Sequence, residues 1–189
     1  MLHNRVAVIF AGGKSSRMGR DKSLLPFGGF GSMSEFQHTK LSQWFGEVYL
    51  SSKTNKFDFD AKLIEDNYPQ SSPLVGLISI FEHLEAEEVF VLSVDAPLVD
   101  QEIITTLYQA SNAYDAVIAK TPGGTQPLCG IYRRSILPKA KEFLAQDNHK
   151  LNFLLKKSHS KFVLFESDAK FANLNHPHEY QEALLVDTL

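Results

Sequence analysis

Residues 6–22 read VAVIFAGGKSSRMGRDK, and this stretch decides the fold. It opens with an apolar run from Val6 to Phe10, typical of a buried strand, and passes directly into Gly12 and Gly13. Glycine adopts backbone angles closed to other residues, so a turn here lets a ligand approach amides that point at anionic oxygens. Four cations follow and can neutralise the remaining charge: Lys14, Arg17, Arg20 and Lys22. The stretch therefore predicts a site for a nucleoside triphosphate.

Two other phosphate loops do not fit this stretch. A Walker loop needs a glycine five residues before Gly13, and that position holds Val8. A dinucleotide fingerprint needs Gly-x-Gly-x-x-Gly, which is absent from residues 6–22. A plain glycine turn with solvated charges is the remaining alternative. The combination of strand, glycines and cations favours the phosphate site.

The composition bounds the class of protein. A length of 189 residues suits one domain, residues 1–189. Hydrophobic residues make up 43% of the chain, which is enough to form a core. The net charge of -3 argues against a nucleic-acid partner. No run approaches the roughly 20 apolar residues of a membrane span, and no signal peptide precedes Val6, so we expect a cytoplasmic protein without a membrane partner. A single cysteine, Cys129, can form neither an internal disulfide nor a thiolate cluster and is expected to be buried.

The order of elements predicts a three-layer α/β/α sandwich with a mainly parallel sheet. Short apolar runs indicate strands at residues 6–10, 48–51, 62–64, 89–94, 116–119 and 162–165. Apolar stripes at helical spacing lie between them, within residues 74–84, 103–108 and 151–155. Strands that alternate with helices favour a parallel sheet covered on both faces.

Two aspartates follow predicted strands, at the sheet edge where ligands of such folds gather. Asp95 ends a very apolar run, and a hard oxygen ligand in a phosphate cleft suits Mg²⁺. Its structural alternatives are a cap for a helix that starts near Asp100 or a turn before Pro97. Asp66 follows another strand, although residues 65–67 could also form an ordinary turn. We expect both aspartates to share one crevice with the glycine loop.

Other segments give weaker signals. Residues 27–33, rich in glycine and serine, predict a mobile loop near the mouth of the crevice, and residues 121–125 predict a hairpin or lid tip. His176 and His178 are not expected to bind a metal, because no third ligand stands at a recognisable spacing.

Residues 10–22 resemble the opening of the molybdenum cofactor guanylyltransferases, LAGGxSxRMGxDK, with Phe10 in place of the leucine. Further matches follow in order: IED at 64–66, PLVG at 73–76, SVDAP at 93–97 and NLNHP at 173–177. The opening marks nucleotidyltransferases in general, whereas the Asn-x-Asn-x-Pro ending is similar to the molybdopterin branch. The resemblance implies a Rossmann-like nucleotidyltransferase fold.

The resemblance also implies the reaction, in which GMP passes from GTP to the phosphate of molybdenum-loaded molybdopterin and pyrophosphate leaves. In-line transfer of this kind needs positioning and charge neutralisation rather than a covalent nucleophile. Lys22 would act at the α-phosphate, Arg17 at the β- and γ-phosphates, and Asp95 on Mg²⁺. Molybdoenzyme maturation proteins are further candidate partners. The implied binding residues are Phe10, Ala11, Gly12, Gly13, Ser15, Lys22, Asp66, Gly76, Asp95, Asn173 and Asn175.

Some positions depart from the family, and several alternatives stay open. Lys53 stands in the segment where the family often carries an asparagine, Phe10 enlarges a position beside the base, and residues 27–32 differ from the usual run. Asn173 and Asn175 would border the pterin, yet the same segment also fits a terminal strand with a helix start at Pro177. The alternative functions are a molybdopterin cytidylyltransferase, a sugar-phosphate nucleotidyltransferase, and a non-catalytic nucleotide-binding partner in molybdoenzyme assembly.

Overall fold

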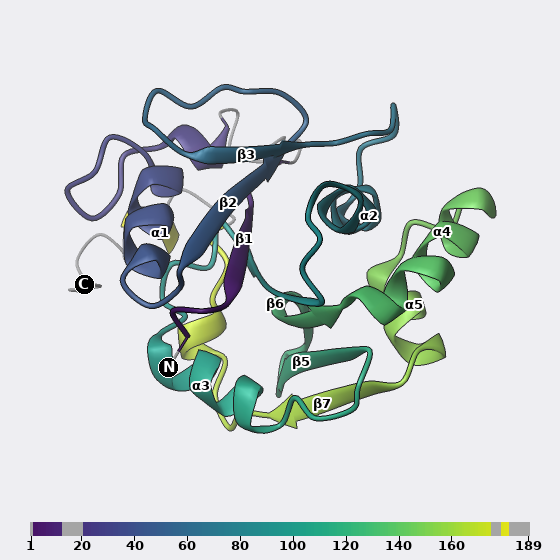
Figure 1. Ribbon diagram of the computed structural model, residues 1–189. Helices are drawn as coiled ribbons and strands as arrows, with labels where there is room; N and C mark the ends of the chain where they lie inside the picture. The colour runs from purple at the N-terminus through teal and green to yellow at the C-terminus, as the bar shows by residue number, and fades with distance from the viewer. Residues whose placement is uncertain (1, 13–20, 175–178, 182–189) are drawn as a thin grey trace.

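A computed structural model describes residues 2–12, 21–174 and 179–181. One seven-stranded sheet crosses the molecule in the order β3-β2-β1-β4-β6-β5-β7 (Figure 1). Its strands are β1 (Val6–Phe10), β2 (Glu47–Ser52), β3 (Lys62–Glu65), β4 (Glu88–Ser93), β5 (Ala116–Thr121), β6 (Gly124–Arg133) and β7 (Ser160–Leu164). The six predicted strands correspond to all of these except β6, with small differences at their ends.

The sheet is mainly parallel, as predicted. Strands β3, β2, β1 and β4 pair in parallel, as do β5 and β7, whereas β6 runs antiparallel to both β4 and β5. The chain leaves β1 toward β2 and β3 and returns to β4 on the other side of β1. Such a reversal opens a crevice at the carboxyl ends of the two strands that flank it, here β1 and β4.

Helices cover both faces of the sheet, which confirms the three-layer α/β/α architecture. Alternate residues of β1 point to opposite faces, so Ala7 and Ile9 join one buried cluster and Val8 and Phe10 the other. Figure 1 shows α1 and α3 on one side of the sheet and α2, α4 and α5 on the other. The helices are α1 (Met33–Ser42), α2 (Pro73–His83), α3 (Gln101–Gln109), α4 (Leu137–Ala145) and α5 (Leu151–Lys157).

Three helices that follow strands begin with capping side chains, and the cap of α3 is Asp100, which accepts the Ile103 amide. Ser72 accepts the Val75 amide at the start of α2, where Pro73 has the fixed backbone angle that suits a first turn. Ser32 caps α1 by accepting the Glu35 amide at 3.1 Å. These caps fix the directions in which the helices leave the ligand edge of the sheet.

Residues 27–33 form a compact turn and the start of α1, which differs from the mobile loop that we predicted. Phe27 and Phe30 exchange backbone hydrogen bonds, and both rings pack edge-on against Phe36 of α1. Gly28 and Gly29 have φ of 57° and 83°, and a Cβ on Gly28 would lie 2.7 Å from the Phe36 ring. The turn thus requires its two glycines, and the aromatic packing explains the unusual FGGF run.

The predicted turn at residues 121–125 is the tip of the β5–β6 hairpin. The Asp168 carboxylate accepts the Gly123 amide at 3.1 and 3.2 Å and so pins this tip. The register between β5 and β6 shifts near Ala119, leaving an irregular stretch around Pro127. Proline is tolerated in a strand at such a bulge, so Pro127 does not interrupt β6.

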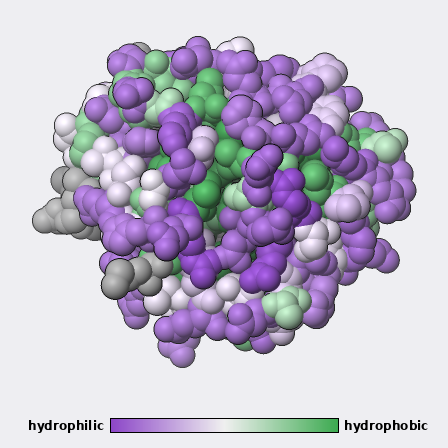
Figure 2. Space-filling model, in the orientation of Figure 1, coloured by the Kyte–Doolittle hydropathy of each residue, from purple (hydrophilic) through white to green (hydrophobic). Residues whose placement is uncertain are grey.

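The surface is mostly hydrophilic on the face in Figure 2, with apolar atoms gathered at the bottom of a hollow near its centre. Cys129 is 3% exposed, which confirms the predicted burial, and that burial raises the pKa of its thiol to about 12. Within the described part of the chain, none of the helices has the length and apolar character that crossing a membrane requires.

Candidate active site

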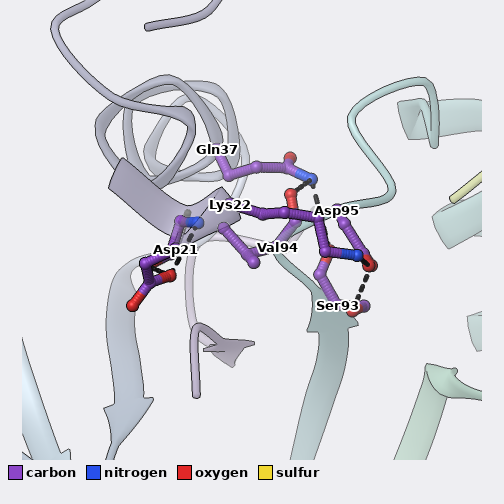
Figure 3. Close-up of polar contacts among 7 residues, drawn as sticks. Asp21, Lys22, Gln37, Ser93, Val94 and Asp95 are labelled. Atoms are coloured by element: carbon purple, nitrogen blue, oxygen red, sulfur yellow. Dashed lines mark hydrogen bonds and ion pairs between the residues drawn. The ribbon is translucent and has the colours of Figure 1, made fainter. Parts of the chain in front are cut away.

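Lys22 and Asp95, 73 positions apart in sequence, meet at the carboxyl edge of β1 and β4. The Lys22 ammonium lies 2.5 Å from a carboxylate oxygen of Asp95, and each side chain is 15% exposed (Figure 3). This contact brings together the end of the glycine segment and the residue after β4, as the sequence predicted. The site therefore presents a cation and a carboxylate side by side, in partial contact with solvent.

The segment that carries Lys22 is fixed by its neighbours. Asp21 accepts the amide and the hydroxyl of Ser23, which starts the short helical turn Lys22–Leu24. Lys56 donates to Asp21 at 2.5 Å and to the Ala11 carbonyl at 2.8 Å. Burial raises the pKa of Asp21, but hydrogen bonds from Lys56 and Ser23 outweigh it and hold the pKa below its usual value. Lys56 thus joins the two ends of the phosphate segment, a role that the sequence did not reveal.

Asp95 is held by contacts from three directions. The Ser93 hydroxyl donates to its carboxylate at 2.6 Å, and the Leu174 amide donates to its backbone carbonyl at 2.9 Å. Asp100, and not Asp95, caps α3 by accepting the Ile103 amide. The structural alternative of a helix cap is therefore excluded for Asp95, whose side chain faces Lys22.

A pocket of about 620 Å³, here called the strand-end pocket, is lined in part by Ser93, the residue that donates to Asp95. Its wall includes four residues that the sequence predicted to bind the nucleotide: Phe10, Gly12, Asp66 and Gly76. Burial raises the pKa of Asp66, an effect that nearby Lys53 partly offsets. Lys53 itself donates to the Pro69 carbonyl at 2.7 Å and holds the loop that follows β3.

Gly76 allows the Phe10 ring to lie against α2. A Cβ at position 76 would come within 2.7 Å of Phe10 Cε1 and 3.2 Å of the Ser51 hydroxyl, so there is no room for a side chain. Gly76 is buried in α2 and lines the strand-end pocket together with Phe10. The larger residue at position 10 and the glycine are thus one packing unit.

Substitution Gly76→Ala should lower the melting temperature and weaken nucleotide binding, because the new methyl group displaces Phe10 into the strand-end pocket. Overpacking of this kind costs about 1–3 kcal/mol, which exceeds the helix preference for alanine of roughly 1 kcal/mol. The double variant Phe10→Leu, Gly76→Ala should recover part of the loss, because leucine has no Cε1 to displace. Calorimetric melting and nucleotide titration of these two variants test this, and equal behaviour of the single and the double variant would contradict it.

A second pocket of about 370 Å³, here called the amide pocket, adjoins the first. Three side-chain amides line it, those of Gln126, Asn152 and Asn173. Both pockets share Pro73, Ser93 and Leu128 in their walls, so they meet next to the Asp95 turn. Asn173 is therefore near Asp95, and the bond from the neighbouring Leu174 amide to the Asp95 carbonyl holds it there.

The remaining predicted site residues divide into two groups. Ala11 is buried, and its backbone groups are engaged, with the amide on Ser51 and the carbonyl on Lys56. It therefore contributes its position rather than a free amide. Four predicted site residues lie outside the described part of the chain, namely Gly13, Ser15, Arg17 and Asn175, as do His176 and His178, which were not expected to bind a metal.

The carboxylate set fits a metal that a substrate helps to bind. Within residues 2–12, 21–174 and 179–181, His, Cys, Asp and Glu form no group of three or more that could hold a metal alone. Mg²⁺ usually takes only one or two protein carboxylates and completes its shell with phosphates and water. Asp95 beside a triphosphate would satisfy this pattern.

This sheet, with its phosphate-type segment after β1 and its aspartate after β4, defines a nucleotidyltransferase of the Rossmann-like class. The sequence model of the MobA-like NTP transferase domain matches residues 7–162, and the chain belongs to this family. It is 42% identical over 178 residues to a molybdenum cofactor guanylyltransferase of Campylobacter jejuni subsp. doylei, covering 93% of each chain. It is 31% identical to a protein of the same name from Helicobacter pylori, covering 98% of this chain and 91% of the other.

Solved structures show the same fold. A molybdopterin-guanine dinucleotide biosynthesis protein A from Archaeoglobus fulgidus superposes with a TM-score of 0.80 at 21% identity, covering 95% of this chain and 96% of the other. A 2-C-methyl-D-erythritol 4-phosphate cytidylyltransferase from Thermus thermophilus gives 0.70 at 14% identity, covering 99% and 100%. The fold is thus shared by proteins named for different bases and acceptors, and it does not by itself distinguish them.

Proposed function

We propose that this protein transfers GMP from GTP to the terminal phosphate of molybdenum-loaded molybdopterin and releases pyrophosphate. The observation that carries the proposal is the Lys22–Asp95 pair at the carboxyl edge of the sheet, which is bonded to Ser93, a residue that lines both pockets. The relatives of 42% and 31% identity named molybdenum cofactor guanylyltransferase support the choice of donor and acceptor.

The two substrates would occupy the two pockets. The guanosine lies in the strand-end pocket against Phe10 and Gly76, and its phosphate chain runs past Gly12 toward Lys22. The pterin lies in the amide pocket, where Gln126, Asn152 and Asn173 can donate to and accept from a polar heterocycle. This arrangement brings the acceptor phosphate to the α-phosphorus near Asp95, on the side opposite to the leaving pyrophosphate.

The charged residues would neutralise the negative charge that develops during transfer. Lys22 stabilises the α-phosphate region, and Arg17 together with amides around Gly13 and Ser15 holds the β- and γ-phosphates. Asp95 would hold Mg²⁺, which when bound orients the triphosphate and draws charge from the attacked phosphorus. In the protein without substrates, the ion pair keeps Lys22 and Asp95 together at the site.

The unit that performs this reaction is proposed to be one domain, residues 1–189, because the single sheet joins elements from Val6 to Leu164. We place the reaction in the cytoplasm, where GTP is supplied. Molybdoenzyme maturation proteins are proposed as recipients of the product.

Asp66 is proposed to read the base, because guanine offers two donors, its N1–H and its 2-amino group, to a carboxylate. Asp66→Ala should therefore weaken GTP binding by about 1.5 to 3 kcal/mol, or roughly 10- to 150-fold, and should leave the weaker binding of CTP unchanged. Thermal shifts with GTP, ITP, CTP, UTP and ATP in Mg²⁺ measure this preference. Exposed Asp58→Ala is the matched control. Equal stabilisation of the unaltered protein by all nucleotides would remove the support for guanine.

The decisive experiment is mass detection of a guanylated pterin from purified protein, GTP, Mg²⁺ and molybdopterin. The same mass with a cytidyl group, formed from CTP in preference to GTP, would indicate a molybdopterin cytidylyltransferase instead. Pyrophosphate release from a nucleoside triphosphate in the presence of sugar phosphates, but not of molybdopterin, would indicate a sugar-phosphate nucleotidyltransferase. Nucleotide binding without any pyrophosphate release would indicate a non-catalytic partner protein.

A further inference from the structure

A lysine side chain of helix α1 contacts the backbone that follows Asp95. The Lys40 side chain is buried, and its ammonium donates to the carbonyls of Pro97 and Val99, the latter at 2.9 Å. These carbonyls lie in the loop that leads from Asp95 to α3. One side chain thus ties two points of this loop to α1.

The same face of α1 also reaches the backbone that precedes Asp95. Gln37 stands one helical turn before Lys40 and is fully buried. Its amide nitrogen lies 3.4 Å from the Val94 carbonyl and 3.5 Å from the Ser93 carbonyl (Figure 3). The backbone is therefore held on both sides of Asp95, by Gln37 before it and by Lys40 after it.

Burying the Lys40 ammonium and the Gln37 amide costs free energy. Apolar side chains at these two positions would fill the same space without that cost. Burial of the ammonium lowers the pKa of Lys40 to about 8, an effect that Asp100 and Cys129 partly offset. Among the described residues, the hydrogen-bond acceptors of the Lys40 ammonium are the backbone carbonyls of Pro97 and Val99. The Gln37 side-chain oxygen is buried without a hydrogen-bond partner there, so only its nitrogen end is used. Because this arrangement costs stability, we expect a functional reason to hold the carbonyls of Ser93, Val94, Pro97 and Val99 in place.

We propose that Lys40 and Gln37 are positioning residues, which fix the turn of residues 93–99 so that the Asp95 carboxylate meets the metal-bound triphosphate in a preset geometry. The inference rests on the proposed function, because it assigns these residues to the metal ligand of that site. Groups that orient a ligand from behind commonly change metal affinity by about 10- to 100-fold when they are removed.

The test compares Lys40→Met, which keeps the length of the side chain but removes its donors, with Lys40→Arg, which keeps charge and donors. Mn²⁺ binding in the presence of GTP, followed by electron paramagnetic resonance well below the melting temperature, is the readout besides activity. We expect Lys40→Met to raise the dissociation constant for Mn²⁺ by about tenfold or more, and Lys40→Arg to recover most of the affinity. The Mg²⁺ concentration for half-maximal pyrophosphate release should rise in parallel. Gln37→Leu should also raise the dissociation constant for Mn²⁺, by a smaller factor, and it replaces Lys40→Met as the test variant if Lys40→Met does not fold.

Ile80→Ala is the matched control, because Ile80 is fully buried in α2 on the opposite face of the sheet. It should lower the melting temperature and leave the dissociation constant for Mn²⁺ unchanged. Lys40 and Gln37 variants that lose stability but bind Mn²⁺ as Ile80→Ala does would overturn the inference. Unaltered protein that binds no Mn²⁺ with GTP would instead contradict the proposed function itself, so the two failures are distinguishable.

Discussion

Asp95→Asn should reduce pyrophosphate release by roughly 10²- to 10³-fold at saturating GTP and molybdopterin. The substitution keeps the shape of the side chain but removes the negative charge that pairs with Lys22 at 2.5 Å and that would hold Mg²⁺. The Ser93 hydroxyl can still donate to the remaining oxygen, so the turn should keep its conformation. Steady-state release assays over a range of Mg²⁺ concentrations measure the effect.

The control for this variant is Asp58→Asn, an exposed aspartate in the connection between β2 and β3. Its rate should equal that of the unaltered protein, and circular dichroism should be the same for both variants. If Asp95→Asn kept most of its activity at low Mg²⁺, a metal role for Asp95 would be untenable.

Lys22→Ala is expected to lower kcat by a similar factor, about 2.7 to 4 kcal/mol in barrier, and to change the KM for GTP much less. The reason is that its ammonium acts on charge that develops during transfer, which affects the transition state more than the bound substrate. Single-turnover rates with preformed GTP complex separate the two effects. The double variant Lys22→Ala, Asp95→Asn should be only slightly slower than either single variant, because residues that act as one unit are not additive.

Lys62→Ala serves as the matched lysine control, since Lys62 is exposed and pairs with Glu47 on the surface. It should leave kcat unchanged. A tenfold rise in KM for Lys22→Ala with normal kcat would assign Lys22 to ground-state binding alone and contradict its role in the transition state.

The sequence predicted the part of the site that follows from the topology of a parallel sheet. Because parallel strands end at one edge, the glycine segment after β1 and Asp95 after β4 could be placed together from their positions alone. The same rule placed Asp66 in the strand-end pocket. The apolar runs were sufficient for six strands, since buried parallel strands are nearly continuous in hydrophobic residues.

The sequence did not predict α1, α4 or β6, and for α1 and β6 the physical reason is plain. The buried face of α1 includes Gln37 and Lys40, so its apolar periodicity is broken by the residues that hold the Asp95 turn. Strand β6 contains Pro127 and Gly130, which normally indicate a turn, and only its bulge makes the proline acceptable. Nothing in the sequence distinguishes Lys56 from a solvated surface lysine, and only the structure shows its contact with the Ala11 carbonyl. The polar groups of Gln37, Lys40 and Lys56 are each satisfied by carbonyls distant in sequence, which no local pattern reveals.

The common wall of the two pockets, formed by Pro73, Ser93 and Leu128, has a consequence for the end of the catalytic cycle. On the proposed function, the product would fill both pockets with one molecule, so we expect its residence time to exceed that of either reactant. We therefore expect product release, rather than bond formation, to limit the rate, and a recipient that takes the product directly from the pockets would accelerate turnover.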